Sequence, residues 1–245
     1  MKGIILAGGK GTRLHPLTRH TNKHLLPVGR EPMIYNPVKN LVACGVDEIL
    51  VVTSSLHMGD IVACLGSGAE FGADFTYKVQ EEARGIADAL RLGRRFAGDE
   101  PVFVLLGDNI FERPLTHFVE NFRSAQGERG ARVMLVKVGN PSAFGVAALD
   151  EHKVVEIQEK PEKPKSDYAV VGAYLYDDRV WGIVDGLSPS RRGEYEITDV
   201  NNAYIARGEL EYDFVQGIWM DTGTFESYHR ANQMLFERDA SSTQP

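Results

Sequence analysis

The chain has 245 residues, of which 43% are hydrophobic and 25% charged, and its formal net charge is −7. These values are ordinary for a globular protein, so they exclude a disordered or fibrous chain, and no apolar run is long enough to span a membrane. The negative charge disfavours a nucleic-acid or anionic-membrane partner. Because Cys44 and Cys64 stand apart and no signal peptide is evident, we expect a cytoplasmic protein with reduced cysteines.

Strand and helix patterns alternate through the first half of the chain. In chain order they predict a strand over Lys2–Ala7, a helix over Pro32–Gly45, a strand over Glu48–Thr53, a helix over His57–Leu65, a strand over Phe75–Val79, a helix over Ile86–Phe96 and a strand over Pro101–Leu106. Such alternation is typical of a mostly parallel sheet with helices on both faces.

After residue 125 strand patterns dominate, with short connections between them. They predict strands over Arg132–Val138, Val146–Leu149, Val154–Gln158 and Ala169–Tyr176, helices over Asp177–Leu187 and Ile197–Arg207, strands near Glu211–Phe214 and Gly217–Met220, and a last helix from Thr224 to about Glu237. The predicted fold class is therefore α/β, a Rossmann-like, doubly wound, mostly parallel mixed sheet with an added β layer. We expect one domain over residues 1–238, with halves 1–125 and 126–238, and a disordered tail over 239–245.

The first thirty residues are rich in glycine and cations and contain no acidic residue. The loop Gly8–Arg13 follows the first predicted strand, and successive free N–H groups in such a loop can bind an anion. Its spacing lacks the Lys-Ser/Thr pair of a Walker loop and has Leu14 where a dinucleotide fingerprint has its third glycine. A structural turn with a solvated basic face is the alternative, but together with Lys10, Arg13 and Lys23 the loop favours a triphosphate cradle.

Two aspartates stand in turns after predicted strands, Asp108 in Gly-Asp-Asn and Asp221 in Met-Asp-Thr-Gly. Asp108 is expected at the carboxyl edge of the sheet, where open α/β sheets bind ligands. Magnesium commonly takes one or two carboxylates and completes its shell with phosphate oxygens and water. Either aspartate alone fits a turn-forming or capping residue, but the pair beside a phosphate cradle suits a magnesium site.

A series of motifs runs in one collinear order from residue 1 to about residue 235. They are Gly8-Gly-Lys-Gly-Thr-Arg13, Lys23-His-Leu-Leu-Pro-Val28, Val79-Gln80, Gly85-Ile-Ala87, Leu106-Gly-Asp-Asn109, Phe144-Gly-Val146, Glu159-Lys-Pro161, the stretch 192–200 and the stretch 219–224. In this order the motifs resemble the sugar-1-phosphate nucleotidylyltransferases, and within them the short-form glucose-1-phosphate thymidylyltransferase branch.

The resemblance implies a role for each candidate residue. The implied catalytic residues are Arg13, Lys23 and Asp108. The implied nucleotide-binding residues are Leu6, Gly8, Gly9, Gly11, Thr12, Arg13, Gln80 and Gly85, of which Gln80 and Gly85 would read the base. The implied sugar-phosphate residues are Asn109, Gly145, Glu159, Lys160, Tyr174 and Arg192, and the implied Mg²⁺ ligands are Asp108 and Asp221.

Taken without the family, several of these residues have plainer interpretations. Lys23 fits a surface lysine, Tyr174 fits core packing, and Arg192 with the stretch 196–199 fits the start of a helix. Glu159 and Lys160 with the following proline fit a turn at the end of a strand. Preorganised cations such as Arg13 and Lys23 would nevertheless stabilise the charge that develops during attack on an α-phosphorus.

The implied reaction joins dTTP and α-D-glucose 1-phosphate to give dTDP-glucose and pyrophosphate. One alternative is a related enzyme that uses UTP or another sugar or cyclitol phosphate, since a single methyl group distinguishes thymine from uracil. Another is a non-catalytic sugar-nucleotide sensor, which we disfavour because the two catalytic cations and both aspartates are present. A homo-oligomer is compatible with the sequence.

Three positions depart from the family's commoner pattern. Phe144 stands where many relatives have tyrosine, Asp88 where the long-form enzymes often have glutamine, and His24 where glutamine often follows the lysine. The chain also ends some tens of residues before the long form does, so the allosteric product site and tetramer of that form are not expected here.

Overall fold

The framework of the molecule is a nine-stranded mixed sheet, seen in a computed structural model that describes residues 1–124 and 129–241. Its strands run in the order β10-β9-β11-β6-β1-β4-β5, with β8 paired to β11 and β12 paired to β8. Their bounds are β1 (Lys2–Leu6), β4 (Glu48–Ser54), β5 (Asp74–Gln80), β6 (Val102–Leu106), β8 (Ala131–Lys137), β9 (Gly145–Asp150), β10 (Lys153–Glu159), β11 (Tyr168–Tyr176) and β12 (Leu210–Phe214). The four strands β5, β4, β1 and β6 are parallel, which confirms the prediction for the first half.

Helices cover both faces of this sheet because neighbouring residues of a buried strand point to opposite sides. Ile4 and Leu6 of β1 belong to one apolar cluster, and Ile5 and Ala7 belong to another. The first cluster includes residues of α3 (Ile86–Arg91), α4 (Arg94–Ala97), α6 (Val180–Asp185) and α7 (Ile197–Ile205). The second includes residues of α1 (Tyr35–Ala43), α2 (Met58–Leu65) and α5 (Thr116–Ser124).

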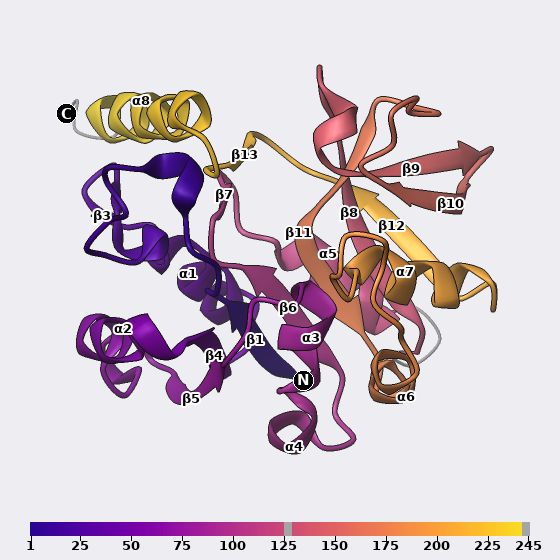
Figure 1. Cartoon of the computed structure of the whole chain (residues 1–245), viewed down its shortest axis with the longest axis horizontal. Helices are drawn as coiled ribbons and strands as arrows, with labels where there is room; N and C mark the ends of the chain where they lie inside the picture. The colour runs from indigo at the N-terminus through magenta and orange to yellow at the C-terminus, as the bar shows by residue number, and fades with distance from the viewer. Residues whose placement is uncertain (125–128, 242–245) are drawn as a thin grey trace.

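Two small ribbons and the last helix form a third apolar cluster beside the sheet. The ribbons are β2 (Pro27–Val28) with β3 (Glu31–Pro32), and β7 (Asn109–Phe111) with β13 (Trp219–Asp221). Helix α8 (Phe225–Ser241) lies beside β2 and β3, so the yellow end of the chain meets its indigo beginning in Figure 1. Two hydrogen bonds hold it there, from the Tyr228 hydroxyl to the Pro27 carbonyl (2.6 Å) and from the Gly29 N–H to Asn232 Oδ1 (3.0 Å).

Short 3₁₀ turns occur at several loops. They are Thr12–Leu14, Lys23–Leu25, Ser55–His57, Ala69–Phe71 and Pro141–Ala143. None of the helices within the described residues is both long and apolar enough to cross a membrane.

The single helix expected over Ile86–Phe96 is wrong, because the segment is broken into α3 and α4. Lys78 Nζ donates to the Leu92 carbonyl at 2.9 Å, so that oxygen is drawn out of the helical ladder. Gly93 then packs so closely on β1 that an added Cβ would lie 2.5 Å from Ile4 Cδ1. A glycine in a helix interior also weakens the helix, and the break falls beside it.

The remaining differences concern elements that the sequence patterns did not signal. Helix α5 and the short strands β2, β3 and β7 were not expected. Helix α8 continues to Ser241, so the first three residues of the expected tail are helical. Residues 242–245 of that tail, and the expected boundary at residues 125 and 126, lie outside the described residues.

Candidate active site

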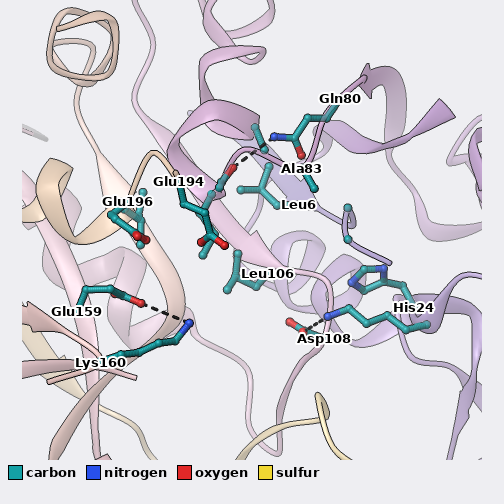
Figure 2. A pocket seen from close by; sticks show the side chains of 17 residues that line it. Leu6, His24, Gln80, Ala83, Leu106, Asp108, Glu159, Lys160, Glu194 and Glu196 are labelled. Atoms are coloured by element: carbon teal, nitrogen blue, oxygen red, sulfur yellow. Dashed lines mark hydrogen bonds and ion pairs between the residues drawn. The ribbon is translucent and has the colours of Figure 1, made fainter. Parts of the chain in front are cut away.

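A continuous cleft opens where the parallel strands of the sheet end. It has a larger cavity of about 270 Å³ and a smaller one of about 140 Å³, which share lining residues that include Leu106, Glu159 and Lys160. The larger cavity is also lined by the candidate residues Leu6, Gly8, Gly9, Lys23, Gln80, Gly85 and Asp108, and the smaller by Asn109, Gly145, Tyr174 and Asp221. Figure 2 shows Gln80 at the top of the view of the larger cavity, with Asp108 and Lys160 below it on opposite sides. Ligands of open α/β sheets bind at this edge.

The glycine loop after β1 is folded back onto the chain segment that carries Lys23. Gly11 has a φ of 60°, and its carbonyl accepts a hydrogen bond of 2.7 Å from the Thr18 hydroxyl. A Cβ at Gly11 would lie 3.2 Å from the Lys23 Cβ, so the loop and the lysine are in close contact. Thr12 lines a third cavity of about 350 Å³, which lies outside the cleft but shares Gly9 and Gln80 with the 270 Å³ cavity.

Lys23 and Asp108 form an ion pair at the floor of the larger cavity. The Lys23–Leu25 turn that presents the ammonium is capped by Asn22, whose Oδ1 accepts the His24 N–H at 2.9 Å. Burial of Asp108 opposes its ionisation, but the Lys23 ammonium outweighs this effect and holds the pKa of the carboxyl well below its usual range. Asp108 is therefore ionised at neutral pH.

Asp221 approaches Asp108 because β13 pairs with β7. Asp221 lies opposite Asn109 in this ribbon, and the Thr222 N–H and hydroxyl donate to the Asp108 carbonyl at 3.0 and 2.8 Å. Burial and the neighbouring Asp108 carboxylate raise the pKa of Asp221 to about 6. Because the negative charges of Asp108 and Asp221 repel each other, the space between the two carboxylates favours a cation.

Arg13 lies beside this pair, although its side chain is exposed and lines neither cavity of the cleft. A Cβ at Gly223 would lie 3.0 Å from Arg13 Nη2 and 2.8 Å from Asp221 Oδ1. The guanidinium group and the two carboxylates therefore lie close together. Arg192, the other candidate arginine, also lines neither cavity but contacts Glu159.

The far end of the larger cavity is formed by Gln80, the last residue of β5, and Gly85, which precedes α3. Gly85 has a φ of 105°, and a Cβ there would lie 2.5 Å from the Tyr195 carbonyl oxygen, so only glycine fits. The Gln80 amide nitrogen donates to the Gly85 carbonyl at 3.3 Å and to Asp88 Oδ2 at 3.0 Å. The amide is thus held in one orientation at the cavity wall.

Glu159 and Lys160 stand at the end of β10, on the opposite side of the cleft. Glu159 accepts hydrogen bonds from the Thr198 hydroxyl at 2.7 Å and from Arg192 Nη1 at 3.2 Å, and Lys160 Nζ lies 3.6 Å from it. Lys160 has a φ of 43°, a backbone conformation that non-glycine residues rarely adopt, and its N–H donates to the Phe144 carbonyl at 2.9 Å. Such strained residues cluster at functional sites, where the surrounding contacts maintain them.

Asn109 and Tyr174 line the smaller cavity while also making internal contacts. Asn109 Oδ1 accepts from the Gly172 N–H at 2.9 Å and from Trp219 Nε1 at 2.7 Å, and its Nδ2 donates to Asp108 Oδ1 at 3.0 Å. Asn109 therefore orients Asp108. Tyr174 is stacked on Tyr176, and burial raises the pKa of its hydroxyl above the usual value, so the hydroxyl stays protonated.

Sequence reasoning assigned no binding or orienting role to several residues that shape the cleft. Trp219 orients Asn109, Thr198 orients Glu159, and Glu194 and Glu196 line the larger cavity. All four fall within quoted motifs, so the signal was present without an assigned role. His24 also lines the cavity, and burial together with the adjacent Lys23 lowers its pKa to about 3, so its ring is neutral at pH 7.

The donor set for a metal ion is sparse. Across residues 1–124 and 129–241 no group of three or more histidine, cysteine, aspartate or glutamate side chains is arranged to hold one. The two carboxylates of Asp108 and Asp221 fit Mg²⁺, which commonly binds one or two protein carboxylates and fills its shell with phosphate oxygens and water.

Almost the whole chain is similar to known proteins. A family model described as nucleotidyl transferase matches residues 2–238. Glucose-1-phosphate thymidylyltransferase of Neisseria meningitidis serogroup A is 44% identical over 235 residues, covering 94% of this chain and 81% of that protein. The Mycolicibacterium smegmatis protein of the same name is 44% identical over 238 residues, covering 96% of this chain and 82% of that protein.

Solved structures give the same picture. A putative glucose-1-phosphate thymidylyltransferase from Bacillus anthracis, in complex with sucrose, is 52% identical with a TM-score of 0.92, and the match covers 97% of this chain and 96% of that one. A UDP-glucose pyrophosphorylase complexed with UDP-glucose has a TM-score of 0.85 at 24% identity and covers 97% of this chain and 98% of that one. The second likeness concerns the fold alone.

Proposed function

The chain belongs to the nucleotidyl transferase family, and we propose that it transfers a thymidylyl group from dTTP to α-D-glucose 1-phosphate in the cytoplasm, giving dTDP-glucose and pyrophosphate. The observation that carries the proposal is the meeting of Lys23, Asp108 and Asp221 at the strand ends. The glycine loop, Gln80, Glu159 and Lys160 line the same cavity as Lys23 and Asp108. The names and identities of the relatives support the substrate pair.

In the proposed reaction a phosphate oxygen of the sugar phosphate attacks the α-phosphorus of dTTP. A new phosphorus–oxygen bond forms there, the bond from the α-phosphorus to the bridging oxygen of the β-phosphate breaks, and pyrophosphate leaves with the electron pair. The nucleophile is already an anion, so no general base is needed. Lys23 and Arg13 stabilise the negative charge that builds up on the phosphoryl oxygens, and Lys160 orients the attacking phosphate.

The two substrates are held by opposite walls of the cleft. The Gln80 amide and the backbone near Gly85 contact the base, and the N–H groups of the glycine loop contact the phosphates. Glu159, fixed by Thr198 and Arg192, accepts hydrogen bonds from the sugar hydroxyls. Asp108 and Asp221 would hold Mg²⁺, which when bound neutralises charge on the nucleotide phosphates.

Pyrophosphate release from the purified protein tests this function. We expect release with dTTP, α-D-glucose 1-phosphate and Mg²⁺, and a panel of four nucleoside triphosphates against several sugar 1-phosphates would rank the substrates. Chelation with EDTA should abolish the release, and added Mg²⁺ should restore it. If no pair of nucleotide and sugar phosphate gives pyrophosphate, the proposed function is wrong.

A further inference from the structure

The amide group of Gln80 has one side turned to two acceptors. Its Nε2 lies 3.0 Å from Asp88 Oδ2 and 3.3 Å from the Gly85 carbonyl oxygen. Carbonyl and carboxylate oxygens are hydrogen-bond acceptors, so the amide nitrogen of Gln80 has to face them. In Figure 2 the nitrogen of Gln80 carries the dashed hydrogen bond and the oxygen is turned away from it.

The Asp88 carboxylate is held in place by two arginines. The residue is 7% exposed, and its Oδ1 accepts from Arg84 Nη2 at 3.0 Å and lies 3.6 Å from Arg91 Nη1. Two guanidinium groups therefore hold Oδ1 of the Asp88 carboxylate, and Oδ2 is left to accept from Gln80.

This orientation determines which atom of the Gln80 amide faces the cavity. The amide oxygen Oε1 lies beside Gly8, where an added Cβ would be 3.2 Å from it, and both residues line the larger cavity. The group that Gln80 offers to a base is therefore an acceptor. Thymine and uracil carry a donor, the N3 hydrogen, on the base-pairing edge, whereas N3 of cytosine is an acceptor.

We propose that Asp88 is a positioning residue that selects the base: by fixing the Gln80 amide it makes the site accept a pyrimidine with an N3 hydrogen and reject cytosine. This inference rests on the proposed function, because it assumes that the base lies against Gln80. The new element is Asp88, which does not line the cleft, contacts no substrate and acts through Gln80.

The nucleotides dTTP and 5-methyl-dCTP provide a matched pair, since they differ only at the base-pairing edge of the ring. For the unmodified protein we expect kcat/KM to be at least about 100-fold higher with dTTP. With 5-methyl-dCTP, two acceptors, N3 of the cytosine ring and Gln80 Oε1, would face each other in a buried site. Direct binding of both nucleotides, measured by calorimetry, provides a second readout that does not require turnover.

Asp88→Asn changes the hydrogen-bonding character with almost no change in shape. The oxygen of the introduced amide should turn to Arg84 and Arg91, which only donate, and its nitrogen should then face Gln80. Gln80 would rotate to meet it and would present its own nitrogen to the cavity. The Gly85 carbonyl still favours the original orientation, so we expect the dTTP preference to fall by about 10- to 100-fold rather than to invert.

Asp185→Asn is the control, because Asp185 pairs with Arg91 and Arg94 but does not contact Gln80. It should leave the preference for dTTP unchanged. Asp88→Ala, which removes the constraint without adding a donor, should lower the preference by a smaller factor. Circular dichroism and thermal melting of each variant separate a changed preference from a lost fold.

Three results would overturn the inference. One is a folded Asp88→Asn protein that keeps the dTTP preference, and another is an equal loss with both nucleotides, which would mean a merely structural role. The third needs no variant: an unmodified protein that uses or binds dTTP and 5-methyl-dCTP equally well. Absence of turnover with every nucleotide instead contradicts the proposed function, and the binding comparison still decides the role of Asp88.

Discussion

At the scale of single residues, the candidate site depends on one ion pair between positions 85 residues apart, Lys23 and Asp108. Both side chains are only 14% exposed, so neither charge is fully solvated. Removal of one partner leaves the other poorly compensated in a low-dielectric place. The same pair lies at the strand ends where the phosphates would bind. We therefore expect its loss to lower the catalytic rate while the fold is retained.

Lys23→Ala should lower kcat for pyrophosphate release by about 10²- to 10³-fold, because one preorganised cation at the developing charge is lost. Far-UV circular dichroism should remain that of the unmodified protein. Lys39→Ala is the matched control, since Lys39 pairs with Glu31 at the surface, away from the cleft. A protein with Lys23→Ala that turns over as fast as the control would contradict the assigned role.

Glu159→Gln should raise KM for the sugar phosphate by about 10- to 100-fold and leave KM for the nucleotide nearly unchanged. The carboxylate accepts from both Thr198 and Arg192, and an amide can satisfy only part of this arrangement. Glu156→Gln, on the same strand but paired with Lys165, should change neither constant. Equal effects of the two substitutions would argue against a role for Glu159 in sugar binding.

At the scale of the elements, Asp177 joins segments that the chain order separates. It follows β11, and its carboxylate accepts from the Gly130 N–H ahead of β8, from Arg179 Nε ahead of α6 and from the Tyr204 hydroxyl of α7, at 2.8, 2.7 and 2.7 Å. The residue is 2% exposed. This buried carboxylate thus connects the starts of β8 and α6 with helix α7 at the end of β11.

Asp177→Asn should lower the free energy of unfolding by about 1–3 kcal/mol at pH 7, since buried donors lose an ionised acceptor. Burial alone would raise the pKa of Asp177, but Arg179, Tyr204 and the Gly130 N–H outweigh it and lower that pKa below its ordinary 3.8. The stabilisation is therefore complete above pH 3.8 and is lost as the pH falls through the folded-state value.

Urea titrations of the unmodified protein and the Asp177→Asn variant, at pH 7 and at a series of values below pH 4, measure this difference. The gap in unfolding free energy between the two proteins should shrink as the pH falls. Asp178→Asn, at the exposed neighbouring position, should show neither the loss at pH 7 nor the change with pH. A gap that stayed constant through the acid range would mean that the Asp177 charge does not contribute.

At the scale of the whole molecule, the two halves share one sheet. Strand β11 of the second half pairs antiparallel with β6 of the first, from Ala173 opposite Leu105 to Tyr176 opposite Val102. A register shift in β11 between Val170 and Tyr174 lets it pair with both β8 and β9. The apolar cluster on one face contains residues of both halves, so neither half has a complete core of its own.

We therefore expect one cooperative unfolding transition. The chain has two tryptophans, Trp181 and Trp219, and both lie in the second half, so fluorescence reports that half while far-UV circular dichroism reports all helices and strands. The two urea midpoints should coincide. A fluorescence transition that precedes the circular dichroism transition would mean that the second half unfolds independently.

Much of this molecule could be predicted from its sequence. Apolar periodicity located most of the strands and helices within a few residues, and the stop at Gly45 was correct because its φ of 74° suits glycine. Several candidate residues stand where a predicted strand ends, among them Gly8, Gln80, Asp108 and Glu159. Hydrophobic period and turn chemistry act over a few neighbouring residues, so one chain suffices to reveal them.

Only the tertiary structure decided which groups face one another. The break after α3 depends on Lys78 reaching the Leu92 carbonyl, the meeting of Asp108 with Asp221 depends on the β7–β13 ribbon, and the direction of the Gln80 amide depends on Asp88. In each case the hydrogen-bond partner or charge that settles the outcome lies outside the local pattern, on another element. Partners of this kind are chosen by packing, which brings together segments that no periodicity connects.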